Sequence, residues 1–133
     1  MSNLDALFAA ARAARDKAYA PYSRFPVGAA IRSGSGALFA GSNVENAAYP
    51  QGCCAEASAI SAMVGAGERR IAAILVIGGG AGLTTPCGGC RQRIREFGGA
   101  DTPVHVAGPE GVRATFTLGE LLPHSFGPEN LTA

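Results

Sequence analysis

The sequence predicts an α/β protein with a mixed β-sheet and helices on both of its faces. The first observation is the order of segments, which is two strands, a helix, a strand, a helix and two further strands. The second is the almost wholly apolar run 71–77, as expected of a strand covered on both faces. The third is the length of 133 residues, which fits one domain, 1–133, with its own core.

The N-terminal part of the chain predicts a helix followed by a β-hairpin. Ser2 or Asn3 can cap the helix, whose apolar positions recur at helical spacing up to Ala14 or Ala18, and which ends before Pro21. Two short strand-like segments follow at 27–31 and 37–41, joined by a Ser-Gly-Ser-Gly turn.

The middle of the chain predicts a loop that carries polar side chains, then a helix and the buried strand. Segment 43–52 has too many polar and turn residues for a regular element. Segment 54–64 has helical periodicity and stops at Gly65 or Gly67. Glycines at 78–82 follow the buried strand. No Lys-Ser/Thr pair comes after them, so a flexible loop is favoured over a phosphate-binding loop.

The C-terminal part of the chain predicts a third helix at 87–97 and a second strand pair. The strands are 104–107 and 112–117, on either side of a Gly-Pro-Glu-Gly turn. A short helical turn at 118–122 then precedes an irregular tail.

Three cysteines have the spacing of a metal site. A single Cys54 at the start of one helix is followed by the pair Cys87 and Cys90 at the start of another. Thiolates are soft ligands that suit zinc, and three of them leave a fourth tetrahedral position for water. Glu56 is placed to act on that water rather than to bind the metal. Cys53 could replace Cys54, but only Cys54 gives the Cys-x-Glu spacing.

Four motifs, in their order along the chain, resemble those of the short-chain cytidine deaminases, which belong to the zinc nucleoside deaminases. The resemblance runs from about Leu4 to Leu131 and implies a three-layer α/β/α sandwich with a mixed five-stranded sheet. The motifs are Tyr22–Ala30, Asn43–Ala47, Cys54-Ala55-Glu56 with Pro86–Cys90, and Leu121-Leu122-Pro123 with Phe126.

The resemblance also implies an activity and a set of site residues. The reaction is zinc-dependent hydrolytic deamination of cytidine and 2′-deoxycytidine to uridine and 2′-deoxyuridine, a step of pyrimidine salvage that releases ammonia. Each subunit of a homotetramer would hold one zinc ion, with Glu56 as the catalytic proton carrier. The substrate would contact Phe25 by stacking, Asn43 and Glu45 through the ribose hydroxyls, the Ala55 backbone at the base edge, and Tyr49 and Phe126 from a neighbouring subunit.

Ala57 is the clearest departure from the family's pattern, since close relatives usually have an arginine directly after the catalytic glutamate. That arginine offsets the negative charge of the thiolates. Helix N-termini favour thiolates but replace a full charge only in part. We therefore expect the metal-bound water to be less acidic here, unless another arginine reaches the sulfurs. Arg91 is the arginine that we expect to turn toward the metal.

Charge and hydropathy exclude several classes of partner. The net charge is +1 without a basic face, which argues against nucleic acid. No apolar run reaches the roughly 18 residues of a membrane span and no signal peptide is evident, so we expect a cytoplasmic protein. Only 16% of residues are charged, against about 25% on average. Such a low fraction suggests surface buried in an oligomer.

Three alternatives stay open. The Cys-x-x-Cys pair could be a thioredoxin-like redox site, although Cys54 and Glu56 then have no task. A closed zinc site with Cys53 as fourth ligand would indicate a binding or regulatory module. A blasticidin-type or free-base deaminase is the nearest enzymatic rival, and the implied ribose ligands argue against it. His105 and His124 lack the spacing of metal ligands.

Overall fold

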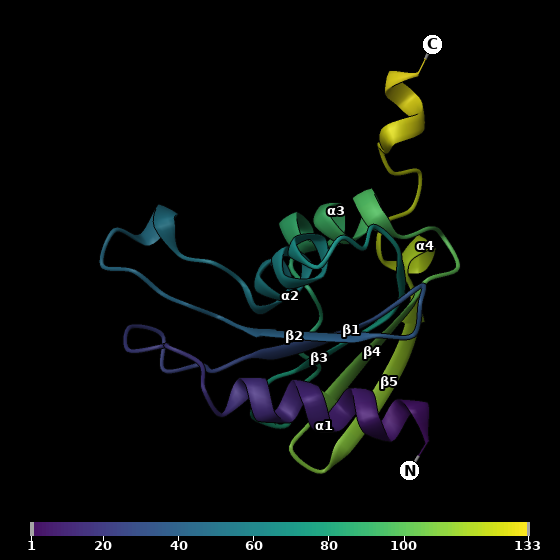
Figure 1. Ribbon diagram of the computed structural model, residues 1–133. Helices are drawn as coiled ribbons and strands as arrows, with labels where there is room; N and C mark the ends of the chain where they lie inside the picture. Colours follow the sequence, from purple (N-terminus) through teal and green to yellow (C-terminus); the bar gives the residue numbers. More distant parts are fainter. Residues whose placement is uncertain (1, 133) are drawn as a thin grey trace.

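The computed structural model describes residues 2–132, which fold around one five-stranded sheet in the order β2-β1-β3-β4-β5. Strands β3 and β4 are parallel and all other neighbours are antiparallel. Helix α1 lies on one face of the sheet, and α2 and α3 lie on the other (Figure 1). The expected α/β/α sandwich is therefore confirmed. The strands are β1 Gly28–Ser33, β2 Leu38–Ser42, β3 Ile71–Ile77, β4 Pro103–Gly108 and β5 Gly111–Thr117; the helices are α1 Asn3–Arg15, α2 Ala55–Gly65, α3 Gly88–Phe97 and α4 Leu118–Leu121.

Strand β3 separates two apolar cores, one on each face of the sheet. Its residues Ile74 and Val76 pack with α2 and α3, and Leu75 and Ile77 pack with α1. All four are at most 1% exposed. The two sides alternate because successive side chains of a strand point to opposite faces. The predicted burial on both faces is therefore confirmed for residues 74–77, whereas Ala72 is exposed.

Two glycines on the paired strands β1 and β2 let the helices approach the sheet closely. A Cβ added at Gly28 would lie 2.1 Å from the Ala11 carbonyl oxygen of α1. A Cβ added at Gly41 would lie 2.5 Å from the Ala59 backbone nitrogen of α2. Neither distance is compatible with a side chain unless backbone moves, so Gly41 fixes how near α2 sits to the sheet.

Helix α1 ends before Pro21, as predicted, and its end follows Ala14 rather than Ala18. It stops at Arg15, and the chain then turns so that Tyr19 donates its N–H to the Asn43 carbonyl at 3.0 Å. Pairing with a distant segment thus overrides the local helical pattern. The other element ends differ from the predicted ones by at most two residues, and two 3₁₀ turns, Tyr49–Gln51 and Pro128–Leu131, lie where irregular chain was expected. Across residues 2–132 no helix has the length and apolarity that a membrane crossing requires.

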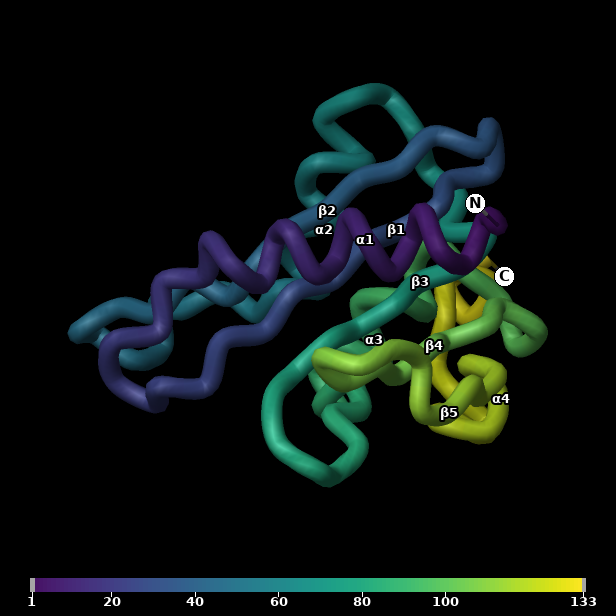
Figure 2. The backbone as a smooth tube through the Cα atoms, turned by 90° about the horizontal axis from the view of Figure 1, so that it is seen from below, coloured from purple at the N-terminus to yellow at the C-terminus, as the bar shows by residue number. Residues whose placement is uncertain are grey.

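Two segments form an arm that extends beyond the sheet. Segments 19–25 and 43–53 run next to each other on the side away from α4, in both views of the molecule (Figures 1 and 2). They are tied by the Glu45 N–H, which donates to the Tyr19 carbonyl at 2.9 Å. Within the arm, Val44 and Cys53 exchange two backbone hydrogen bonds of 2.9 and 2.8 Å. The arm leads directly into α2 and so connects the polar loop to the cysteine motif.

Candidate active site

The three predicted metal ligands converge at the N-termini of α2 and α3. Cys54 is the N-cap residue of α2, Cys87 is the N-cap residue of α3, and Cys90 lies in the first turn of α3. Their sulfur atoms all lie within 4.8 Å of one another. The fold thus brings together thiols that are more than thirty positions apart in the sequence.

Other candidate ligands, Cys53 and His105, lie outside this group. All four cysteines are free thiols, and Cys53 is exposed on the arm rather than part of the cluster. His105 lies on β4 with its Nδ1 atom 2.8 Å from Thr115 Oγ1 of β5. Among residues 2–132, the cluster contains neither Cys53 nor a histidine. The protein therefore offers three sulfur ligands and no fourth from these residues.

The electrostatics of the cluster suit a divalent cation. The backbone N–H of Cys90 lowers the pKa of the Cys87 thiol, as a helix N-terminus should. Burial raises the pKa of Cys54 and of Cys90, and each is raised further by the charge of the neighbouring thiolates and of Glu56. A bound cation would relieve this mutual repulsion. The three soft, crowded thiols thus fit a zinc ion with an open position.

Glu56 is a buried carboxyl group beside the thiols. It lies in the first turn of α2 and is 5% exposed. Burial raises its pKa, while the positive charge of Arg93 and the side chain of Cys90 act in the opposite direction. A carboxyl with a raised pKa beside a metal site has the properties of a general acid and base.

The two predicted ribose ligands hold the backbone of segment 22–27, which lies opposite them. Asn43 accepts the Val27 N–H at 2.9 Å and donates to the Phe25 carbonyl at 3.0 Å. Glu45 accepts the N–H groups of Tyr22 and Ser23 at 2.9 and 3.1 Å, and it also accepts the Ser23 hydroxyl. Their side chains therefore order the segment that carries Phe25. No local pattern in the sequence indicates these contacts, because the partners are 16 to 23 positions apart.

A pocket of about 370 Å³ lies on the arm. It contains two of the predicted substrate-binding residues, Glu45 and Tyr49, and the Tyr22 and Tyr49 rings lie 5.8 Å apart at its wall. Phe25 lies two positions after the lining residue Ser23 and is 43% exposed. Ala55, at the start of α2, is 1% exposed. The pocket lining is Tyr22, Ser23, Glu45, Asn46, Tyr49 and Gly52.

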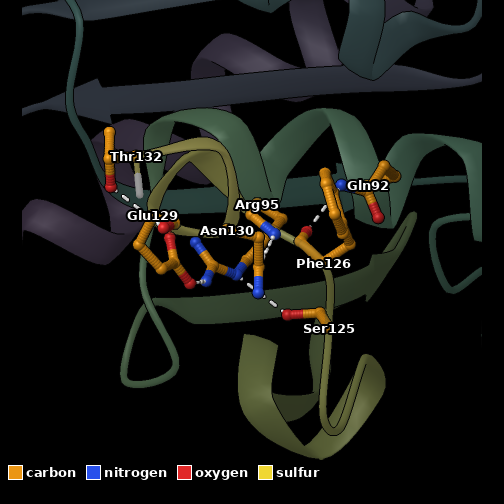
Figure 3. A network of polar contacts seen from close by, with 8 residues as sticks. Gln92, Arg95, Ser125, Phe126, Glu129, Asn130 and Thr132 are labelled. Atoms are coloured by element: carbon orange, nitrogen blue, oxygen red, sulfur yellow. Dashed lines mark hydrogen bonds and ion pairs between the residues drawn. The ribbon is translucent and has the colours of Figure 1, made fainter.

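Phe126 comes from the C-terminal tail, which is fastened to α3. Gln92 donates to the Phe126 carbonyl at 2.9 Å, and Arg95 donates to Ser125 Oγ at 2.8 Å (Figure 3). Arg95 also forms an ion pair with Glu129. The Phe126 backbone is thus held while its side chain is 57% exposed. This residue does not line the pocket on the arm of its own chain.

The expectation that Arg91 turns toward the metal is wrong. Its guanidinium donates to the Pro86 carbonyl at 2.7 Å and to the Leu121 carbonyl at 2.9 Å, so it fastens the loop before Cys87 to α4. Arg93 instead donates to Cys90 Sγ at 3.6 Å. The sequence contained the signal for this contact, because residues three apart share one face of a helix.

Comparisons with known proteins agree with this geometry. Residues 1–106 match the family described as cytidine and deoxycytidylate deaminase zinc-binding region. The chain is 39% identical over 130 residues to a cytidine deaminase of Sporosarcina psychrophila, covering 98% of this chain and 96% of the relative.

Solved structures extend the likeness to the fold. The crystal structure of cytidine deaminase from Burkholderia pseudomallei has a TM-score of 0.87 and 45% identity, and the match covers 95% of this chain and 100% of that one. The crystal structure of cytidine deaminase from Mycobacterium tuberculosis has a TM-score of 0.81 and 37% identity, with 96% and 99% coverage.

Proposed function

Because the chain belongs to the cytidine and deoxycytidylate deaminase family, we propose that it deaminates cytidine and 2′-deoxycytidine by zinc-dependent hydrolysis. The products are uridine or 2′-deoxyuridine and ammonia. The observation that carries the proposal is the convergence of three sulfurs within 4.8 Å of one another beside the buried Glu56. This arrangement combines an open metal site with a proton carrier.

Cys54, Cys87 and Cys90 are the proposed zinc ligands. When bound, zinc lowers the pKa of water toward about 7 and so supplies a nucleophile at neutral pH. Glu56 accepts a proton from the attacking water and delivers it to N3 of the pyrimidine, which makes C4 electrophilic. As the C4–N bond breaks, Glu56 transfers the proton of the new C4 hydroxyl to the departing amine. The C4 carbonyl forms and ammonia leaves.

The arm supplies the proposed nucleoside contacts. Asn43 and Glu45 bind the ribose hydroxyls, Phe25 stacks on the pyrimidine, and the Ala55 backbone meets the base edge. The hydrogen bonds within the arm support these roles, since the side chains of Asn43 and Glu45 already hold the backbone of the segment around Phe25. A preorganised site loses less conformational entropy when it binds.

We further propose a cytoplasmic homotetramer of single-domain chains, 1–133, that acts in pyrimidine salvage. Tyr49 and Phe126 would complete the site of a neighbouring subunit. Their exposure supports this, at 75% and 57%, because aromatic side chains are enriched at protein interfaces. The low fraction of charged residues, 16%, agrees with extensive burial between subunits.

The first experiment follows the fall in ultraviolet absorbance when zinc-loaded protein is mixed with cytidine, with chromatographic identification of uridine. Glu56→Gln should retain zinc and lose about 10²–10⁴-fold in kcat, the usual contribution of a positioned acid and base. Glu110→Gln, at the exposed turn between β4 and β5, is the matched control and should keep parental activity.

Other outcomes assign other functions. Disulfide exchange without zinc would support a redox pair, and water-free zinc without turnover would support a closed regulatory site. Conversion of free cytosine but not cytidine would overturn the nucleoside assignment.

A further inference from the structure

We propose that Arg93 is the cation that offsets the negative charge of the zinc–thiolate centre and so keeps the metal bound. The inference rests on the proposed zinc ligands and goes beyond them, because it assigns a positioning role to a residue outside the ligand set. A zinc ion with three thiolates carries one net negative charge. One guanidinium group beside the sulfurs makes the centre neutral.

The Arg93 guanidinium lies against the first turn of α3. Its Nη1 atom is 3.6 Å from Cys90 Sγ, within the range of a hydrogen bond to sulfur. A Cβ added at Gly89 would lie 3.4 Å from the same nitrogen and 4.0 Å from Cys87 Sγ. The guanidinium therefore lies next to the turn that carries two of the three thiols, and Gly89 leaves space for it.

The charge of Arg93 is directed at the site rather than at a surface carboxylate. The ion pairs among residues 2–132 join Arg95 to Glu129 and Arg113 to Glu110, and neither includes Arg93. Cys90 is completely buried, so its thiolate has no solvent to stabilise it. Charge-assisted hydrogen bonds are the strong ones, and groups that hydrogen-bond to a metal's ligands tune the metal site.

The opposite wall of the same hollow belongs to α2. A pocket of about 380 Å³ lies between the two helices, lined by Ala57 and Ser61 from α2 and by Arg93 and Glu96 from α3. The small side chain of Ala57 leaves room there. A cation placed at position 57 would enter the space that the Arg93 side chain borders, so the charge can be supplied from either helix.

The test measures zinc affinity of the purified holoenzyme by competition with a colorimetric chelator. Arg93→Gln should weaken zinc binding by about 10–100-fold, the usual effect of losing a group that hydrogen-bonds to a metal ligand. Arg93→Lys should retain most of the affinity because it keeps the charge. Arg12→Gln removes the same charge from α1, on the opposite face of the sheet, and should leave the affinity unchanged. Circular dichroism checks the fold of each variant.

A rescue variant separates charge from packing. Ala57→Arg combined with Arg93→Gln should recover affinity if the centre needs a cation rather than the Arg93 stem, and recovery with either this variant or Arg93→Lys supports the proposal. Parental affinity in Arg93→Gln, or a loss that neither cation restores, would overturn it. A parent protein that binds no zinc would overturn the proposed function and this role together. An active, zinc-loaded parent with an unaffected Arg93→Gln variant overturns this role alone.

Discussion

Glu45 is held in place before any nucleoside arrives, because three donors of residues 22 and 23 converge on its carboxylate. Hydrogen bonds from Ser23, first from its side chain and then from its backbone, lower the pKa of Glu45. Glu45 is thus a charged acceptor with a fixed orientation. The ribose hydroxyl that we propose as its donor would meet an oriented partner, and the Ser23 hydroxyl is the contact that a substitution can remove most cleanly.

Ser23→Ala should raise KM for cytidine by about 2–10-fold and change kcat less, since one lost hydrogen bond is worth about 0.5–1.5 kcal/mol. Steady-state kinetics test this. The matched substrate is 2′,3′-dideoxycytidine, which lacks the 2′ and 3′ hydroxyls, and the variant and the parent should bind it equally well. An equal KM increase with both substrates would mean that Ser23 acts on the arm as a whole and not through Glu45.

Single residues were predictable from the sequence where a short spacing encodes the chemistry. Two positions separate Cys54 from Glu56, and three separate Cys87 from Cys90. The placement of each group at the start of a helix could therefore be predicted directly. Arg91 was favoured because it directly follows Cys90, and Arg93 was therefore missed. In a helix, however, a residue three positions after Cys90 lies on the same face as Cys90.

The close contact of β2 with α2 fixes the position of the metal-binding helix. Gly41→Ala would place a Cβ 2.5 Å from the Ala59 nitrogen and 2.8 Å from the Ser58 carbonyl carbon. These are backbone atoms, so the helix itself must move. Overpacking of this kind costs about 1–3 kcal/mol of unfolding free energy. Because α2 carries Cys54 and Glu56, zinc affinity should fall as well.

Urea unfolding and chelator competition measure the two effects in the same variant. Gly65→Ala is the matched control, since nothing lies within 4 Å of its added Cβ at the end of α2. It should be neutral or slightly stabilising. If Gly41→Ala has the same free energy of unfolding and the same zinc affinity as the parent, the helix is not held by this contact.

Elements were predictable where local pattern and tertiary packing agree. Segment 71–77 is apolar throughout and matches β3 at both ends. The N-terminal helix shows the opposite case, since its periodicity continues past Arg15 while the chain leaves the helix. Backbone pairing of Tyr19 with Asn43 there depends on a segment more than twenty positions away, and no local pattern encodes it.

Large hydrophobic side chains are exposed on the arm and on the C-terminal tail, as well as at single positions elsewhere such as Leu83. Tyr49 on the arm and Phe126 on the tail are the two exposed aromatics that the resemblance assigns to a neighbour's site. The tail is not loosely attached, because Gln92 and Arg95 of α3 hold it on both sides of Phe126 (Figure 3). An aromatic ring that protrudes from a firmly held segment is suited to contact another subunit. The resemblance already assigned Phe126 to a neighbouring site, but the contacts that hold the tail could not be predicted, because they join residues 34 and 30 positions apart.

Phe126→Ala should lower kcat/KM by about tenfold or more, as expected for truncating an aromatic anchor at an interface. Leu131→Ala, 78% exposed on the same tail, is the control and should have no effect. Sedimentation equilibrium should give the mass of four chains for the parent protein.

Subunit mixing tests whether Phe126 acts across the interface. Glu56→Gln and Phe126→Ala chains, each impaired alone, are expressed together under two different affinity tags, and the mixed assembly is isolated. If Phe126 serves a neighbouring site, some sites combine Glu56 from one chain with Phe126 from the other. Activity should then exceed the average of the two separate variants. If each chain serves only itself, every site lacks one residue and mixing yields no more than that average. An average activity in an assembly shown to contain both chains would contradict the shared site.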